Sequence, residues 1–271
     1  MTGDRLVVTA DDYGLTDATC RAILQAHHRG VVTATSVLAV VPDLEARLAL
    51  LDDAPDLSVG VHLAVVGEDP PLLTAREVPT LVDRHGRFRR SWRELLPRLA
   101  LGRVDLEDLR RELGAQLERV AAARPPTHLD THQHIHLWPS VGELVVDLAL
   151  RHGIGAVRVP RSASSGLRGR GIARLADRLA ARAGAAGLAT TARFRGLDEA
   201  GGWNAPKLVA ALEDLARGSG SVEVNLHPGA ATDAERDRYG WGYHWSDELA
   251  AATDPRVRSA VERLGFELVG R

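Results

Sequence analysis

Histidines and aspartates are concentrated in one short segment of the chain. Between residues 128 and 136, four histidines and one aspartate occupy only even-numbered positions. Side chains alternate faces along an extended strand, so these positions would share one side as far as the strand continues. Imidazole ligates zinc and other first-row metals, and a nearby carboxylate can ligate or orient a ligating ring. The pattern indicates a metal site built from some of His128, Asp130, His132 and His134.

A pair of adjacent carboxylates, Asp11 and Asp12, follows the apolar run of residues 6–10. One carboxylate can bind a cation while its neighbour accepts a proton from an activated water, because the two side chains leave the backbone in different directions. Taken alone, such a pair before a helix is more often an N-cap. His62 and His227 also lie within or after apolar runs. This coincidence near strand ends favours a shared site.

The elements that would position these residues follow a β/α rhythm. A helical pattern at residues 16–28 follows the first strand-like run, and a longer one spans residues 105–123. No Gly-x-Gly-x-x-Gly follows the first strand, which disfavours a dinucleotide-binding fold. We predict a TIM-like β/α barrel, either closed or distorted and seven-stranded, whose strand ends converge on one face. The predicted strands are residues 6–10, 33–41, 58–65, 127–131, 156–159, 190–194 and 221–226.

We expect residues 1–271 to form a single domain, because β/α barrels commonly use about 250 residues. Residues 67–103 interrupt the rhythm with several prolines and many arginines, which predicts an inserted excursion. It is interpreted as a surface loop or as a lid over the barrel mouth.

Composition excludes several classes of protein. The formal net charge is −2, with 34 basic and 36 acidic residues spread along the chain, so a general nucleic-acid binder is not expected. Cys20 is the only cysteine, which fits a reducing compartment. The polar start at Met1 to Arg5 and the lack of a long apolar stretch predict neither a secretory signal nor membrane insertion. We expect a cytoplasmic protein, and homodimerisation is left open.

At this point the sequence resembles the YdjC-like carbohydrate deacetylases, which include the chitooligosaccharide deacetylases. The resemblance runs the length of the chain. Its marks are ADDYGL at 10–15, GVVTATS at 30–36, GVHL at 60–63, HLDTHQHIH at 128–136 and HPG at 227–229. The resemblance implies a β/α barrel and hydrolytic removal of acetyl groups from N-acetylated sugars, so a small carbohydrate is the expected substrate.

The resemblance also implies roles for individual residues. It places one divalent metal ion, zinc or magnesium with nickel or cobalt as alternatives, on Asp12, His62 and His132. It makes Asp11 the general base and His227 the acid. A protonated His227 would donate to the departing amine after attack by water on the amide carbon.

Other residues are expected to support or surround that site. His128, Asp130 and His134 are candidates for orienting the ligands or binding substrate. Arg158 would contact Asp11 or the sugar, or form a structural ion pair. Departures from the family pattern are Tyr13, Thr131 and Gln133, none of them an inferred ligand. Five aromatic residues of the last third would serve packing more often than sugar stacking: Trp203, Tyr239, Trp241, Tyr243 and Trp245.

Three other functions remain open from the residues. Two histidines and one carboxylate also form the facial triad of non-haem iron oxygenases. Histidine-rich barrels support metal-dependent phosphoester hydrolysis as well. A non-enzymatic metal-binding regulator or storage protein would leave Asp11 and His227 without a role.

Overall fold

A computed structural model describes residues 4–271 of the protein. Residues 1–3, which belong to the predicted domain and to its polar start, lie outside the described residues. Its centre is a curved parallel sheet whose strands follow the order β5-β4-β3-β2-β1-β7-β6. The strands are β1 (Arg5–Tyr13), β2 (Ala34–Val37), β3 (Ser58–Leu63), β4 (His128–Thr131), β5 (Ala156–Val157), β6 (Arg193–Arg195) and β7 (Val222–Leu226). The predicted seven-stranded, distorted β/α barrel is therefore confirmed.

The ring of strands comes close to closure between its two ends. Ala189, which precedes β6, bonds to Gly155 and Val157 on either side of Ala156 in β5. A further strand, β8 (Glu267–Leu268), pairs within residues 4–271 only with the start of β1 and lies outside the ring. The fold is thus not a regular eight-stranded barrel.

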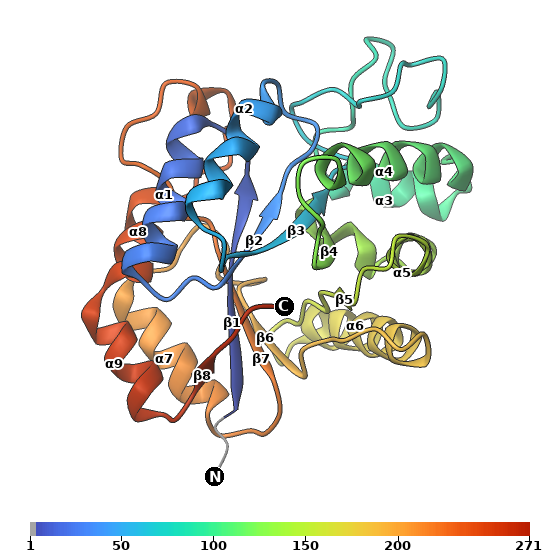
Figure 1. The fold of residues 1–271 in the computed structure, drawn as a ribbon. Coiled ribbons are helices and arrows are strands. Elements are labelled where there is room, and N and C mark those ends of the chain that lie inside the picture. The colour runs from blue at the N-terminus through green and yellow to red at the C-terminus, as the bar shows by residue number, and fades with distance from the viewer. Residues whose placement is uncertain (1–3) are drawn as a thin grey trace.

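Helices cover the outer face of the sheet, and their apolar sides form the main hydrophobic core with the outward-facing strand residues (Figure 1). Side chains at several helix starts accept a hydrogen bond from the first turn, as Thr16 and Asp105 do, which satisfies otherwise unpaired N–H groups. The α-helices are α1 (Asp17–Arg29), α2 (Leu44–Ala49), α3 (Trp92–Ala100), α4 (Leu106–Ala121), α5 (Pro139–Arg151), α6 (Leu167–Ala185), α7 (Ala205–Leu215), α8 (Trp245–Thr253) and α9 (Pro255–Arg263). Short 3₁₀ turns are η1 (Leu50–Asp53), η2 (His132–Leu137) and η3 (Arg236–Arg238).

The interior of the ring is polar, unlike the outer core. Along β7, Glu223 and Asn225 alternate with apolar residues and are fully buried. Arg158, directly after β5, is also fully buried. Because alternate residues of a strand face opposite sides, one side of each strand packs under the helices while the other lines the ring.

The predicted excursion at residues 67–103 is attached to the rest of the protein by hydrogen bonds and is not a free loop. Buried carboxylates of α4 hold it: Glu112 accepts from the backbone N–H groups of Leu72 and Leu73, and Asp108 accepts from Thr80. The Tyr239 hydroxyl donates to Asp69 at 2.7 Å. Figure 1 shows the loop beyond α3 and α4. These bonds fix its position over one side of the strand ends.

Candidate metal centre and active site

The first strand is irregular where its two carboxylates lie. The pairing of β1 with β2 shifts register between Ala10 and Tyr13, and Asp12 has a φ of 65°. In a regular strand, consecutive side chains would face opposite sides, whereas a bulge changes their direction. As a result, Asp11 faces the interior of the ring and Asp12 faces two histidines from other strands. A left-handed conformation at a non-glycine residue is costly and occurs mainly at functional sites.

Asp12, His62 and His132 meet in a nearly equilateral triangle. Asp12 Oδ1 lies 3.5 Å from His62 Nε2 and 3.5 Å from His132 Nδ1, and the two ring nitrogens are 3.4 Å apart. Ligands of a tetrahedral zinc ion at about 2.1 Å lie about 3.4 Å from one another. Within residues 4–271, Asp12 Oδ1 is buried without a hydrogen-bond partner. An unpaired buried oxygen beside two imidazoles is what a cation would satisfy.

A second group of three ligand atoms, from Asp11, His62 and Asp130, also lies within 4.8 Å. Its carboxylates are already engaged. Arg158 donates to both oxygens of Asp11 at 2.7 Å, and Asp130 accepts from Ser36 and contacts His62. The group with the unpaired Asp12 oxygen is therefore the better fit for a metal.

Asp130 orients the His62 ring. Its Oδ1 lies 2.5 Å from His62 Nδ1, which leaves Nε2 directed toward Asp12. A carboxylate behind a ligating histidine fixes the ring and increases its basicity. Burial lowers the pKa of His62, but the carboxylates of Asp130 and Asp11 outweigh it and raise the pKa to about 9. Without a cation, His62 thus carries a proton at neutral pH.

The expectation that His128, Asp130, His132 and His134 share one strand face is only partly correct. β4 ends at Thr131, and the chain then turns, with φ of 54° at both Gln133 and His134. His128 lies deeper in the ring, 3.2 Å from Ser36 Oγ, and does not reach the ligand triangle. His134 lines the cleft over the site. The alternation stops with the strand, because turn backbone has no period of two.

Arg158 lies at the centre of a buried ion-pair network. It donates to both oxygens of Asp11 at 2.7 Å and also contacts Asp130 at 2.8 Å and Glu223 at 2.9 Å. The structure contains the expected contact with Asp11, and the Arg158 side chain is fully buried. Burial raises the pKa of Asp11, but Arg158 outweighs it and lowers the pKa to about 2. Asn225 Nδ2 donates to the same carboxylate at 3.0 Å.

His227 faces Asp11 from the end of β7. Its Nε2 lies 4.0 Å from Asp11 Oδ2, while its Nδ1 lies 3.7 Å from Glu248 Oε2 on α8. The backbone N–H of His227 donates to the same Glu248 oxygen. Burial lowers the pKa of His227, but Glu248 outweighs it and raises the pKa above its usual value. This arrangement favours a protonated imidazole beside the carboxylate pair.

Sequence reasoning missed Glu223, Asn225 and Glu248. The first two were detectable, because they alternate with apolar residues along the run that leads to His227. Glu248 had no comparable signal, since it reaches the site from a helix 21 residues beyond His227.

The buried charges of the ring do not balance. Asp11, Asp130 and Glu223 pair with the guanidinium groups of Arg158 and Arg271, whereas Asp12 pairs with no arginine among residues 4–271. With neutral histidines, two negative charges remain uncompensated. Burying unpaired charge is costly, so a divalent cation at the triangle would bring this cluster to neutrality.

A cleft of about 550 Å³ opens over these residues. Trp241 packs 5.0 Å from His132, and Tyr243 packs 4.8 Å from His227, ring centre to ring centre. Trp203 instead lies buried in the core, as expected of the aromatic residues. The excursion contributes Arg90, Ser91, Trp92 and Arg93 to the lining of the cleft. A second hollow of about 1050 Å³ shares Glu68, Arg90 and Gly240 with this cleft.

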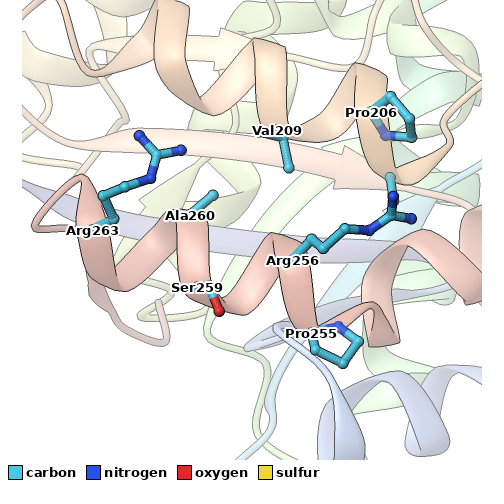
Figure 2. A pocket seen from close by; sticks show the side chains of 8 residues that line it. Pro206, Val209, Pro255, Arg256, Ser259, Ala260 and Arg263 are labelled. Atoms are coloured by element: carbon cyan, nitrogen blue, oxygen red, sulfur yellow. The ribbon is translucent and has the colours of Figure 1, made fainter.

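Another groove, of about 490 Å³, lies between α7 and α9 (Figure 2). Prolines, small residues and two arginines line it, and none of its lining residues is a histidine or a carboxylate. It offers no acid–base or metal-ligating group, so the histidine cleft is the candidate active site.

Among residues 4–271, no helix has the length and apolar character needed to cross a membrane.

The family model and the similar proteins of known name point to the same family. The sequence model of the YdjC-like protein family matches residues 5–263. A chitooligosaccharide deacetylase of Yersinia pestis (strain Pestoides F) is 31% identical over 97% of this chain and 96% of its own. A carbohydrate deacetylase of Brevibacillus brevis is 36% identical over 58% of this chain and 59% of its own length.

One solved structure has the same fold over nearly the whole chain. It is a protein of Enterococcus faecalis V583 provisionally described as a cellobiose-phosphate cleavage protein. The TM-score is 0.82 with 25% sequence identity, and the match covers 99% of this chain and 97% of that one.

Proposed function

The chain belongs to the YdjC-like protein family, and from this premise we propose that it is a metal-dependent carbohydrate N-deacetylase. The substrate class follows from relatives named as carbohydrate and chitooligosaccharide deacetylases. The observation that carries the proposal is the unpaired, buried Asp12 oxygen beside His62 and His132, with Asp11 and His227 on its flank.

Asp12, His62 and His132 would hold one divalent ion. When bound, such an ion acidifies a water molecule and polarises an amide carbonyl. The charge deficit of the buried cluster supports a divalent ion, and two imidazoles beside one carboxylate are a donor set that suits zinc.

Asp11 accepts the proton of the attacking water at its carboxylate. Arg158 and Asn225 fix this carboxylate and keep it ionised. The same contacts make it a weak base, so the water must be acidified for the transfer to occur. The water oxygen forms a bond to the acetyl carbon in this step.

His227 donates a proton to the leaving nitrogen as the bond between carbon and nitrogen breaks. Glu248 accepts from the backbone N–H of His227, and its charge, 3.7 Å from the ring Nδ1, favours the protonated state of the imidazole. The products are acetate and a free amino sugar. One carboxylate that accepts and one imidazole that donates, on either side of an electrophilic centre, suit hydrolysis of an amide.

Phosphoester hydrolysis is the second candidate. Arg90, Arg93 and Arg168 line the cleft and form no ion pair with any residue of 4–271. Free guanidinium groups recognise phosphate. Release of inorganic phosphate from phosphorylated sugars, without release of acetate, would favour this alternative.

The test is acetate release from N-acetylglucosamine oligosaccharides by metal-stripped protein, before and after addition of zinc, magnesium, nickel or cobalt. Asp12→Asn should abolish metal-dependent release, and Asp11→Asn should reduce kcat by about 10²- to 10⁴-fold. The matched control is Asp56→Asn, because Asp56 is exposed. Full activity of Asp12→Asn, or of metal-stripped protein, would contradict the proposal.

A further inference from the structure

The ion pairs around Arg158 continue away from the cleft, toward the end of the barrel where the strands begin. Arg158 Nε donates to Glu223 Oε1 at 2.9 Å, and the second oxygen of Glu223 accepts from the guanidinium of Arg271. Glu223 is fully buried, and the Arg271 side chain is 4% exposed. Asp11, Arg158, Glu223 and Arg271 therefore form one continuous chain of alternating charges.

Arg271 is held at the start of the strands, far from the cleft. Its backbone N–H donates to Ser58 Oγ at 2.9 Å, and Ser58 is the first residue of β3. The preceding β8 pairs with Arg5 and Leu6 of β1. Figure 1 shows this end of the chain among the strands rather than outside the helices. The Arg271 guanidinium thus enters the ring from below.

Glu223 has several further partners that fix its place. It accepts from the Thr9 hydroxyl at 2.9 Å and lies within 3.4 Å of the Thr191 hydroxyl. The two arginines are its only cationic partners in the part of the chain that the structure describes. Removing Arg271 would leave Arg158 as the only arginine paired with Asp11, Asp130 and Glu223 among residues 4–271, a costly arrangement in a buried site.

We propose that Arg271 is a positioning residue for the base Asp11. Arg271 neutralises Glu223 from the side away from the cleft. The Arg158 guanidinium can then bind Asp11 through both of its terminal nitrogens. Without Arg271, Glu223 draws Arg158 toward the bottom of the ring, and Asp11 loses its fixed orientation. This inference rests on the proposed function for its effect on kcat, but the movement of Arg158 is independent of activity.

The experiment compares Arg271→Met and Arg271→Lys with the control Arg193→Met. Arg193 forms an ion pair with Asp4 at the same end of the barrel, and among residues 4–271 its guanidinium forms no hydrogen bond or ion pair with Arg158 or Glu223. Arg271→Met should lower kcat for acetate release by about 10- to 100-fold, with KM within about twofold. Arg271→Lys should recover part of that loss, because it returns a positive charge. Arg193→Met should keep its kcat.

The second readout is the NMR signal of the Arg158 Nε–H group, which is buried and hydrogen-bonded. It should shift in Arg271→Met and stay unchanged in Arg193→Met. If Arg271→Met does not fold, the double variant Glu223→Gln/Arg271→Met removes the unpaired carboxylate and should still shift the signal and lower kcat.

The outcomes separate the two proposals. An unchanged Arg158 signal, an unchanged kcat in an active enzyme, or an equal loss in Arg193→Met would overturn the role of Arg271. If wild-type protein releases no acetate with any metal, the proposed function fails. The Arg158 signal would then still decide whether Arg271 positions the network.

Discussion

Two neighbouring carboxylates, Asp11 and Asp12, have different electrostatic surroundings. Both oxygens of Asp11 accept from Arg158, so its charge is compensated and its orientation is fixed. Asp12 Oδ1 has no hydrogen-bond partner among residues 4–271 and faces two imidazoles. The first carboxylate suits proton transfer at a fixed point, and the second suits binding of a cation.

The pH dependence of turnover tests the role of Glu248. Its charge outweighs burial and raises the pKa of His227, so the imidazole stays protonated above its usual range. Activity that needs this proton is present at low pH and falls as the pH rises through the pKa of His227. Glu248→Gln should move the alkaline limb of kcat to lower pH, because the carboxylate charge that raises the pKa of His227 is removed. The measurement is kcat from pH 5 to 10 at saturating metal.

Asp247→Asn is the matched control, because Asp247 is the neighbouring acid on α8 and has no contact with His227. An alkaline limb that stays in place in Glu248→Gln would rule out His227 as the titrating acid.

At the scale of elements, close packing of strands decides which residues reach the site. A Cβ at Gly60 would lie 2.4 Å from the ring of His128, so only glycine lets β3 pass over that histidine. The turn after β4 has left-handed backbone at Gln133 and His134, which ends the strand and directs His132 toward Asp12.

Gly60→Ala tests this packing. The added methyl group forces the His128 ring to move, which should cost about 1–3 kcal/mol of unfolding free energy. In the double variant Gly60→Ala/His128→Ala, the space left by the ring should accept the methyl group. Urea denaturation should therefore show a loss from the double variant smaller than the sum of the two single losses. Strictly additive losses would mean that the two residues do not compete for the same space.

The Gln133 side chain attaches the excursion to the turn that follows β4. Its Oε1 accepts from the backbone N–H of Trp92 at 2.9 Å, at the start of α3, and Trp92 is 37% exposed at the cleft. Gln133→Ala should detach this segment from the turn and raise KM for oligosaccharides by about 3- to 10-fold, since one hydrogen bond contributes about 1 kcal/mol. The kcat should change little, because no proton donor or acceptor moves.

Hydrogen exchange of residues 90–100 provides the second measurement, and it should become faster in Gln133→Ala. Leu101→Ala is the control, because Leu101 is exposed at the end of α3 and does not line the cleft. A loss of kcat with KM unchanged would show that Gln133 acts on the reacting groups instead.

At the scale of the whole molecule, the protein combines an apolar shell with a charged interior. The helices bury their apolar faces against the outside of the strands, while the inside of the ring holds acidic and basic residues. The excess of negative charge inside makes stability depend on a cation or on bound protons. In the metal-free protein, protonated His62 supplies part of the missing positive charge.

Metal removal should therefore destabilise the protein most at high pH. The folded-state pKa of His62 is about 9, above its usual 6.5, so the proton's contribution is complete below about pH 6.5 and is lost as the pH rises through 9. The increase in Tm on adding zinc should thus be larger at pH 9.5 than at pH 6.5, measured by calorimetry at equal free zinc. A ligand at about 100 times its Kd stabilises by about 2.7 kcal/mol.

The His62→Gln variant should lose this difference between the two pH values. An increase in Tm that is the same at pH 6.5 and 9.5 in the wild-type protein would contradict the proposed exchange of a proton for a metal ion.

The sequence by itself determined the β/α barrel class and the residues that gather at its mouth. Apolar runs and helical periods repeat along the chain, and the polar residues at strand ends converge because parallel strands share one direction. Only the tertiary structure decided the orientation, contacts and charge partners of those residues. The bulge at Asp12, the left-handed turn after β4, Glu248 from a distant helix and the Arg271 side chain below Arg158 all depend on contacts between segments remote in sequence. Local periodicity carries no information about such contacts, because burial and charge pairing are set by which elements meet in space.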